Sequence, residues 1–329
     1  MTKQKEKVPP SKLDNLNTLF KVMEKTVGPG AGRPITQKEI IPVERIPTGS
    51  FMADWVLCGG IPTKRIVELF GNESSGKTTL ALSTIAQAQA KGKRCAFVDV
   101  EHGFDPDWAV KFGINLDELL FVTPDHGEGA IEATRIMAAS GLVQLIVVDS
   151  VAALVPKSEL AGDVGEAHMG KQARLMSQGM RLLAGEASKN ECGVIFINQL
   201  REKIGVLFGN PETTTGGRAL RFYSSIRLET RVIGPVKEGE ELVGVKIRLR
   251  AVKNKLGPPY RSAEAVLLYE GRFDSDGELL ELAIDRKIVE QNHSHFYYKD
   301  EHIGQGRAAA IEWLSQAENL AEIKKQLGV

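Results

Sequence analysis

The segment Gly71–Thr78 has the residues and spacing of a phosphate-binding loop. It reads Gly-Asn-Glu-Ser-Ser-Gly-Lys-Thr, follows the apolar run at 65–70 and opens a helix-like stretch at 77–91. Glycines let backbone N–H groups curl around phosphates, the lysine reaches the outer phosphates, and the threonine hydroxyl is a ligand for Mg²⁺. The positive end of the following helix adds to this attraction. The pattern predicts a nucleoside triphosphate site in which Lys77 and Thr78 make the polar contacts.

Two acids and one aromatic residue could complete this chemistry. Asp149 closes the apolar run at 145–150, and an acid in that place holds Mg²⁺ in nucleoside-triphosphatases of this class. Glu101 follows the run at 95–100 and could activate the attacking water. A solvated loop acid explains Glu101 equally well. Trp108 could stack on a base, although packing on a short helix is the commoner role for such a residue.

The elements around these residues alternate along the chain. Helix-like stretches at 77–91, 127–140 and 168–188 separate apolar runs at 65–70, 95–100, 145–150 and 193–198. Continuous apolar strands between helices indicate a buried parallel sheet. After residue 225 the pattern becomes that of hairpins, which predicts antiparallel strands at one edge. Residues 273–278 read as a turn or boundary, and 275–329 as a small mixed unit ending in a helix around 308–327.

Composition excludes several classes of protein. The chain has 329 residues, with 42 Lys+Arg against 42 Asp+Glu, so it is not a uniformly basic nucleic-acid protein. Its three cysteines lie far apart, which argues against a disulfide framework and favours a reducing compartment. No apolar run is long enough to cross a membrane, and the polar N-terminus lacks a signal core. We therefore expect a cytoplasmic protein without a membrane partner.

Local basic patches and two glycine-rich segments are candidates for nucleic-acid contact. The stretch 246–261 holds six Lys/Arg and no acid, and Arg218, Arg221 and Arg227 form a second acid-free set. A solvated strand face is the alternative to phosphate contact. The segments 159–170 and 200–217 lack helix or strand periodicity and carry apolar residues, which suit unstacked bases.

The N-terminal stretch 11–27 has apolar residues at three- and four-residue spacing, which predicts an amphipathic helix. The glycine- and proline-rich segment 28–34 then reads as a linker. From these residues alone, a helix folded back on its own core and a helix docked on a neighbouring subunit are equally consistent.

Seven segments together resemble the bacterial RecA recombinases. In chain order they are GNESSGKTTL, VDVEHGFDP, LIVVDSVAAL, HMGKQARLMSQ, FINQLREKIGVLFGNPETTTGG, ALRFYSSIRLE and AVKNK. The similarity covers about residues 45 to 325, and NPETTTGG is far more specific than a phosphate loop. The resemblance implies an α/β fold with a RecA-like ATPase core at 41–273. It also implies an N-terminal polymerisation arm at 1–40 and a small α+β C-terminal domain at 274–329.

The resemblance implies ATP and Mg²⁺ as cofactors. Glu101 would polarise the attacking water, Lys77 would act with it, Gln199 would sense the γ-phosphate, and Lys253 and Lys255 would reach the nucleotide of a neighbouring subunit. Mg²⁺ would be held by Thr78 and, through water, by Asp149. The nucleotide-binding set is Gly71, Asn72, Glu73, Ser74, Ser75, Gly76, Lys77, Thr78, Thr79, Asp105, Trp108 and Asp149. Trp108 stands where the family usually has a tyrosine.

The resemblance also implies two DNA-binding loops, at 162–169 and 200–214. The DNA-contacting residues would be Met169, Arg174, Arg181, Arg201, Ile204, Thr215, Gly216 and Gly217. Phe222 would pack between subunits of a helical filament, and the N-terminal helix would become a polymerisation arm. Single-stranded DNA and homologous double-stranded DNA are the implied partners, with an SOS repressor and loading proteins as further ones.

Several departures mark a divergent member. The family's aromatic-Gly-Lys-Gly run is replaced by Thr26-Val27-Gly28-Pro29-Gly30, Glu202 adds an acid to the second loop, and the end AEIKKQLGV lacks the usual acidic tail. We expect easier duplex uptake from the last feature. Three functions stay open: a strand-exchanging ATPase, a nucleoprotein scaffold that signals damage, and a DNA-independent motor of the same fold.

Overall fold

The computed structural model describes residues 16–28, 32, 43–162, 170–202 and 212–327. The chain divides into two compact units, Met1–Val43 and Glu44–Val329. In the first unit the described secondary structure is helix α1, Leu16–Val27, and none of its residues is buried. Leu16 and Val27, at its two ends, are 68% and 75% exposed, whereas Phe20 and Met23 are half-buried. A helix in this stretch was expected, and its use as an arm stays a prediction.

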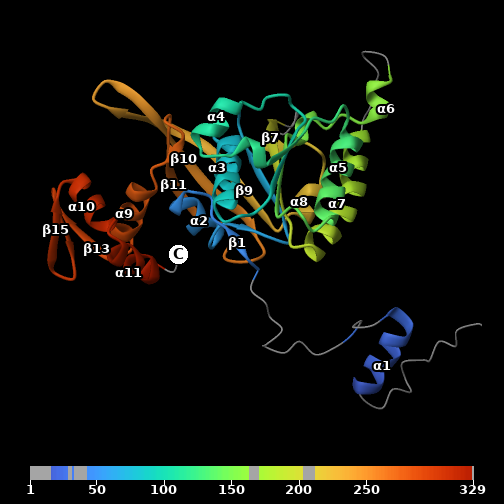
Figure 1. Cartoon of the computed structure of the whole chain (residues 1–329), viewed down its shortest axis with the longest axis horizontal. Coiled ribbons are helices and arrows are strands. Elements are labelled where there is room, and N and C mark those ends of the chain that lie inside the picture. The colour runs from blue at the N-terminus through green and yellow to red at the C-terminus, as the bar shows by residue number, and fades with distance from the viewer. Residues whose placement is uncertain (1–15, 29–31, 33–42, 163–169, 203–211, 328–329) are drawn as a thin grey trace, which may run out of the picture. The chain divides into compact units, whose positions relative to one another are not determined.

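A ten-stranded sheet forms the centre of the second unit, in the order β12-β11-β10-β9-β3-β7-β6-β4-β5 with β8 paired to β7 (Figure 1). Six neighbouring strands are parallel: β3 Ile66–Gly71, β4 Cys95–Asp99, β5 Leu119–Val122, β6 Leu145–Asp149, β7 Gly193–Glu202 and β9 Ile226–Glu238. Three more are antiparallel at one edge: β10 Glu241–Asn254, β11 Ser262–Leu268 and β12 Arg272–Phe273. The expected fold, a mostly parallel sheet with antiparallel edge strands, is confirmed.

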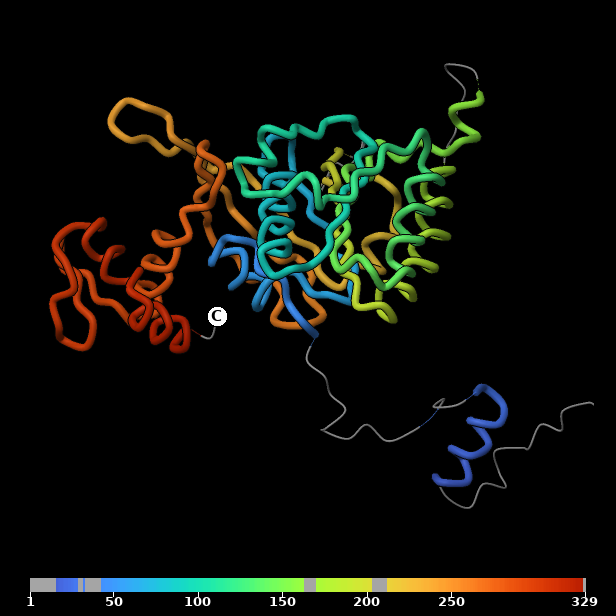
Figure 2. The backbone as a smooth tube through the Cα atoms, viewed as in Figure 1, coloured from blue at the N-terminus to red at the C-terminus, as the bar shows by residue number. Residues whose placement is uncertain are grey.

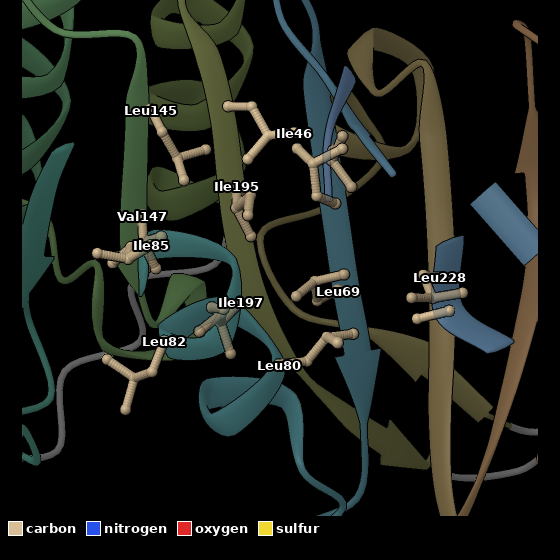
Figure 3. Close-up of a cluster of buried hydrophobic side chains, with 14 of the residues drawn as sticks. Ile46, Leu69, Leu80, Leu82, Ile85, Leu145, Val147, Ile195, Ile197 and Leu228 are labelled. Carbon is tan, nitrogen blue, oxygen red and sulfur yellow. The ribbon is translucent and has the colours of Figure 1, made fainter. Parts of the chain in front are cut away.

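Helices cover both faces of this sheet and so bury its central strands on both sides. The helices are α2 Phe51–Leu57, α3 Lys77–Ala90, α4 Pro106–Lys111, α5 Gly127–Ala139, α6 Lys157–Leu160, α7 Lys171–Lys189 and α8 Ala219–Tyr223. Along β4, Phe97 belongs to the core cluster under α3, whereas Val98 belongs to the cluster under α5 and α7. Figure 3 shows part of the first cluster, in which Leu82 and Ile85 of α3 lie among side chains of the sheet.

The antiparallel edge includes a long hairpin of β9 and β10, joined at Glu238 and Glu241. Figure 2 shows the hairpin, in yellow and orange, extending beyond the helices that cover the sheet. A short ladder of β1 Arg45–Ile46 and β2 Ile61–Pro62 flanks the entry to this unit. Among the described residues, no helix is both long and apolar enough to span a bilayer.

The C-terminal part has its own small sheet and its own core cluster. It consists of α9 Ser275–Asp285, β13 Val289–Asn292, β14 His295–Tyr298, β15 Glu301–Gln305, α10 Arg307–Leu314 and α11 Ala317–Leu327. Leu280, Phe296 and Leu314 pack in this cluster. The arrangement confirms a small antiparallel sheet with helices, and the domain boundaries at 40 and 273 stay predictions.

The expectation of one helix around 308–327 was wrong. The segment forms α10 and α11, which are separated by Ser315 and Gln316. The Asn319 amide donates to the Trp313 carbonyl at 2.9 Å, and the Ser315 hydroxyl donates to the Ile311 carbonyl at 2.8 Å. These side chains satisfy carbonyls at the end of α10 and so stabilise a break in the helix.

Two other segments also differ from their expected form. Residues 273–278 are more than a turn, because α9 begins at Ser275, where the Asp274 carboxylate accepts from the Gly277 N–H. The segment 200–217 is not irregular throughout, because β7 continues to Glu202 and pairs with β8, Glu212–Thr214. Two threonines in β8 favour a strand, and their pairing with β7 stabilises the short ladder. Local periodicity could not reveal this ladder, because it depends on residues about ten positions apart in the chain.

Candidate functional site

The predicted phosphate loop connects β3 to the first turn of α3. Gly76 precedes the helix with φ 83°, a left-handed conformation that favours glycine. A Cβ at Gly71 would overlap the carbonyl oxygen of Thr230 on β9, so only glycine fits there. The hydroxyls of Ser75 and Thr230 are 2.8 Å apart and share a hydrogen bond. The neighbouring strand therefore fixes the loop at the carboxyl end of the sheet.

Lys77, Thr78 and Asp149 lie close together at this loop. Lys77 is 8% exposed, and its ammonium donates to the Asn72 carbonyl at 2.5 Å. Burial lowers the pKa of Lys77, against the opposing effect of Asp149 and other acids. The Thr78 hydroxyl donates to the Asp149 carboxylate at 2.7 Å, and burial raises the pKa of Asp149 to about 6. A hydroxyl beside a carboxylate fits the oxygen preference of Mg²⁺.

A cleft of about 370 Å³ adjoins the loop and has one polar and one apolar wall. Its polar wall contains residues 74–79, and its apolar wall contains Trp108, Val245, Leu267 and Tyr269. Trp108 also contacts Phe112 edge-to-face, with ring centroids 5.3 Å apart. The structure thus brings Trp108 to the phosphate loop while it packs on α4. Asp105 does not line this cleft, and its carboxylate accepts from the Trp108 backbone N–H at the start of α4.

A hydrogen bond joins the side chains of Glu101, two residues after β4, and Gln199, on β7. The Gln199 amide donates to the Glu101 carboxylate at 3.1 Å, and its oxygen accepts from Arg201 at 3.3 Å. Gln199 also lines a hollow of about 350 Å³ together with Gly71, Asn72 and Glu73 of the phosphate loop. Glu101 and Gln199, two predicted functional residues from separate segments of the chain, are therefore in direct contact.

A buried polar network lies directly behind Gln199. Asn198 is fully buried, and its side-chain oxygen accepts from the Gln199 N–H at 2.9 Å and the Thr215 hydroxyl at 2.5 Å. Its amide donates to the Glu68 carboxylate at 2.9 Å. Arg227 forms a 2.5 Å ion pair with the same carboxylate. The network connects β3, β7 and β9 to Thr215, at the end of the second predicted DNA loop.

The described residues among the predicted DNA contacts lie on α7, on β7 and in the segment that follows β8. Arg174 and Arg181 are exposed on α7, two helical turns apart, so they share one face. Gly216 and Gly217 have φ 77° and 76°, and a Cβ at Gly217 would lie 2.8 Å from Ala173 on α7. The structure thus brings the end of the second loop against α7 beside Arg174. Arg201 is exposed on β7, while Met169 and Ile204 lie outside the described residues.

Lys253 and Lys255 do not line the cleft beside the phosphate loop. The Lys253 ammonium donates to the carbonyls of Arg221 and Phe222 at 2.6 and 3.1 Å, at the end of α8. Burial and the nearby charges of Lys255 and Arg227 lower the pKa of Lys253 to about 8. Phe222, on the same helix, is 69% exposed. Lys255 is exposed, whereas the Lys253 ammonium is held by two carbonyls of its own subunit, and the role of both lysines stays a prediction.

Sequence reasoning missed Tyr269, Glu68 and Asn198. Tyr269 follows the strand run at 262–268, and its position at a strand end was the only available signal. Glu68 lies in the apolar run of β3, where a charged residue is unexpected and demands a buried partner. Asn198 lies on β7 directly before Gln199, the predicted γ-phosphate sensor, and this position could have indicated a functional role.

Two family models match the chain and together cover most of it. The model described as RecA N-terminal domain matches residues 14–274. The model described as RecA C-terminal domain matches residues 277–328. Their common boundary falls where β12 ends and α9 begins.

Proposed function

Because the chain belongs to the RecA family, we propose that it is a recombinase that forms helical filaments on single-stranded DNA and hydrolyses ATP when DNA is bound. In this proposal it pairs the bound strand with homologous double-stranded DNA and exchanges strands in repair. One observation carries the proposal: Gln199 contacts Glu101 through its side chain and is linked to Thr215 through Asn198. A nucleotide-side residue and a DNA-loop residue therefore share one hydrogen-bonded network.

The nucleotide chemistry is assigned to residues around the phosphate loop. Bound MgATP supplies the phosphoanhydride and the divalent charge that the site requires. Lys77 binds the outer phosphates, and Thr78 and Asp149 hold the metal, the latter through water. Glu101 accepts the proton of the attacking water, since its carboxylate is exposed beside the loop. Trp108 and Tyr269 hold the base against the apolar wall of the cleft.

The coupling of nucleotide to DNA is assigned to Gln199 and Asn198. The Gln199 amide is a donor that can contact either the Glu101 carboxylate or a phosphate oxygen, but not both with the same hydrogen. The Gln199 backbone N–H donates to the Asn198 oxygen, which also accepts from the Thr215 hydroxyl, so a movement of Gln199 on changing its partner would reach Thr215. Since Gly217, two residues after Thr215, lies against Ala173 of α7, such a change would reach the proposed DNA-contacting residues Arg174 and Arg201.

Filament assembly is assigned to residues around α8 and to helix α1. Phe222 is an exposed aromatic residue on a short helix, and Lys253 lies beside it. Lys253 and Lys255 would reach the nucleotide of an adjacent subunit, so that ATP holds two subunits together. Helix α1, none of whose residues is fully buried, is the proposed polymerisation arm. Repressor self-cleavage and contact with loading proteins have the family resemblance as their sole support.

The first test is ATP hydrolysis with and without homopolymeric single-stranded DNA, at low and moderate salt. We expect strong stimulation that weakens with salt, because phosphate contacts release counterions. Appreciable hydrolysis that ignores DNA would instead support a DNA-independent motor of the same fold. Electron microscopy separates these functions further, because the recombinase should form helical filaments and a motor of that kind closed rings.

A further inference from the structure

Two histidines lie side by side on the small C-terminal sheet, away from the residues assigned above. His295 begins β14 and His302 is on β15. The Nδ1 atom of His295 and the Nε2 atom of His302 are 3.1 Å apart. The Tyr297 ring packs against His302 in an edge-on arrangement, with centroids 5.3 Å apart, and so limits the rotation of that imidazole.

A β-bulge places the two histidines on one face. The register between β14 and β15 shifts at Phe296 and Tyr297, so that His302 is opposite Tyr297. In a regular ladder that starts from the pair His295 and Gln305, His302 would be opposite Tyr298 and would face the core. The bulge instead sends Ile303 inward, where it is 7% exposed, and His302 outward. His302 thereby becomes a diagonal neighbour of His295, within reach of an imidazole ring.

The spacing of the two nitrogens is that of two ligands on one metal ion. With metal–nitrogen bonds of about 2.0–2.1 Å, nitrogens 3.1 Å apart subtend roughly 100° at the ion. That angle lies between octahedral and tetrahedral values. Imidazole is a preferred ligand of zinc, copper and nickel. In the metal-free protein the same two nitrogens share one proton in a hydrogen bond.

The surroundings suit a cation that keeps some of its water. Glu290 is opposite Tyr297 on β13, so its carboxylate is on the same face as the histidines. Among the described residues no group of three histidine, cysteine or acidic side chains gathers to hold a metal. Two protein ligands therefore leave the remaining coordination positions to water or to a partner.

We propose that this face of the C-terminal sheet binds one divalent transition-metal ion, of the zinc, copper or nickel class, through His295 Nδ1 and His302 Nε2. The ion would join β14 to β15 across the bulge and place positive charge on the exposed face of the C-terminal sheet. This site is independent of the proposed recombinase function, since neither histidine belongs to the nucleotide or DNA residues.

The test is a calorimetric titration of the full chain with Zn²⁺ at pH 7.5, in the presence of Mg²⁺. We expect one tight Zn²⁺ per chain, and at least about tenfold weaker binding in both His295→Ala and His302→Ala, because losing one ligand removes the chelate. His302→Asn should show the same loss with a polar side chain of similar size. The matched control is His293→Ala, in the turn that joins β13 to β14, which should bind as the parent does.

Two further readouts make the outcome decisive. Zn²⁺ should raise the thermal midpoint of the parent chain but not that of His302→Asn. Binding should weaken at pH 5.5, because the imidazoles must be neutral to coordinate the ion. Equal Zn²⁺ affinity in the parent and all the histidine variants would overturn the proposal. A ratio of one Zn²⁺ to two chains would also overturn it, because the site would then lie between molecules.

Discussion

At the scale of single residues, the nucleotide site depends on one buried ammonium. Lys77 is held beside the phosphate loop by the Asn72 carbonyl and has acids on its other side. Lys77 also lines the cleft beside the phosphate loop, where an incoming phosphate would lie. Burial also lowers the pKa of Lys77. The nearby carboxylates of Asp149 and Glu101 oppose this shift and favour the charged ammonium.

We expect Lys77→Ala to reduce ATP hydrolysis by at least about 100-fold, because it removes the positive charge that stabilises the transferring phosphoryl group. Steady-state phosphate release in the presence of single-stranded DNA measures this loss. Lys91→Ala, at the exposed end of the same helix, is the matched control and should hydrolyse ATP normally. Unimpaired turnover in Lys77→Ala would refute the site assignment.

Trp108 supports a second prediction at this scale. Trp108 and Tyr269 line the apolar wall of the cleft, so an adenine in that cleft would lose an aromatic partner in Trp108→Ala. We expect roughly 5- to 150-fold weaker ATP binding, the range of one lost base–aromatic stack. Trp108→Phe keeps a ring and should retain most of the affinity. Equilibrium binding of a fluorescent ATP analogue checks both variants, and equal affinity in all three proteins would exclude stacking.

At the scale of elements, the buried network joins three strands to the second loop. Glu68 is fully buried and accepts from both Asn198 and Arg227, so its charge is compensated. Asn198 then holds Gln199 and Thr215 at fixed positions relative to β3. Because hydrogen bonds link Gln199 to Thr215 through Asn198, DNA and nucleotide need not touch each other for their effects to be coupled.

Asn198→Ala should therefore uncouple DNA from hydrolysis. We expect the stimulation by single-stranded DNA to fall by about tenfold, a usual size for coupling between sites, with a smaller change in DNA-free hydrolysis. Asn190→Ala removes an amide that bonds only within the end of α7 and serves as the control. Parallel loss of both activities would mean that Asn198 acts in folding alone.

Helix α8 supports a prediction about assembly. Phe222 is 69% exposed, so Phe222→Ala should change the stability of the subunit by less than about 0.5 kcal/mol. If Phe222 packs between subunits, the same change should prevent filament formation on single-stranded DNA. Light scattering and electron microscopy measure assembly, and Leu242→Ala removes a comparably placed apolar side chain on the hairpin as a control. Normal filaments from Phe222→Ala would place the interface elsewhere.

At the scale of the whole molecule, Glu278 connects the C-terminal part to the central sheet. Its buried carboxylate accepts from the Ser50 hydroxyl at 2.7 Å, the Met52 N–H at 3.1 Å and the Val266 N–H at 3.2 Å. Burial raises its pKa to about 8, far above that of an exposed glutamate. The folded protein therefore binds a proton at this site that the unfolded chain releases.

The raised pKa of Glu278 makes the protein less stable as pH rises. Between pH 4.5, the ordinary pKa of a glutamate, and about pH 8, the folded state holds a proton that the unfolded chain has lost. The stability due to Glu278 is therefore greatest below pH 4.5 and is lost as pH rises through 8. Glu278→Gln should flatten the decline of the unfolding free energy between pH 5 and 8. It should also cost about 1–3 kcal/mol at pH 6, because one backbone N–H loses its acceptor.

Urea unfolding of Glu278→Gln at several pH values checks this prediction. Asp285→Asn, at the exposed end of the same helix, should keep the pH dependence of the parent chain. An unchanged slope in Glu278→Gln would show that another group carries the dependence.

The sequence by itself determined the features that depend on local patterns. The phosphate loop, the alternation of apolar strands with helices, and the antiparallel edge follow from spacing and residue type, and the structure confirms the fold they predict. The segment NPETTTGG identified the family, which the family models bear out. These features were accessible because neighbours in the chain create them.

Only the tertiary structure decided which distant residues meet. Tyr269 reaches the phosphate-loop cleft because β11 lies two strands from β9, an order that no local pattern encodes. Glu68, Asn198 and Arg227 come from three strands, and their pairing depends on burial that makes an unpaired charge too costly. The pairing of His295 with His302 depends on a register shift of one residue, which reverses the face of a side chain.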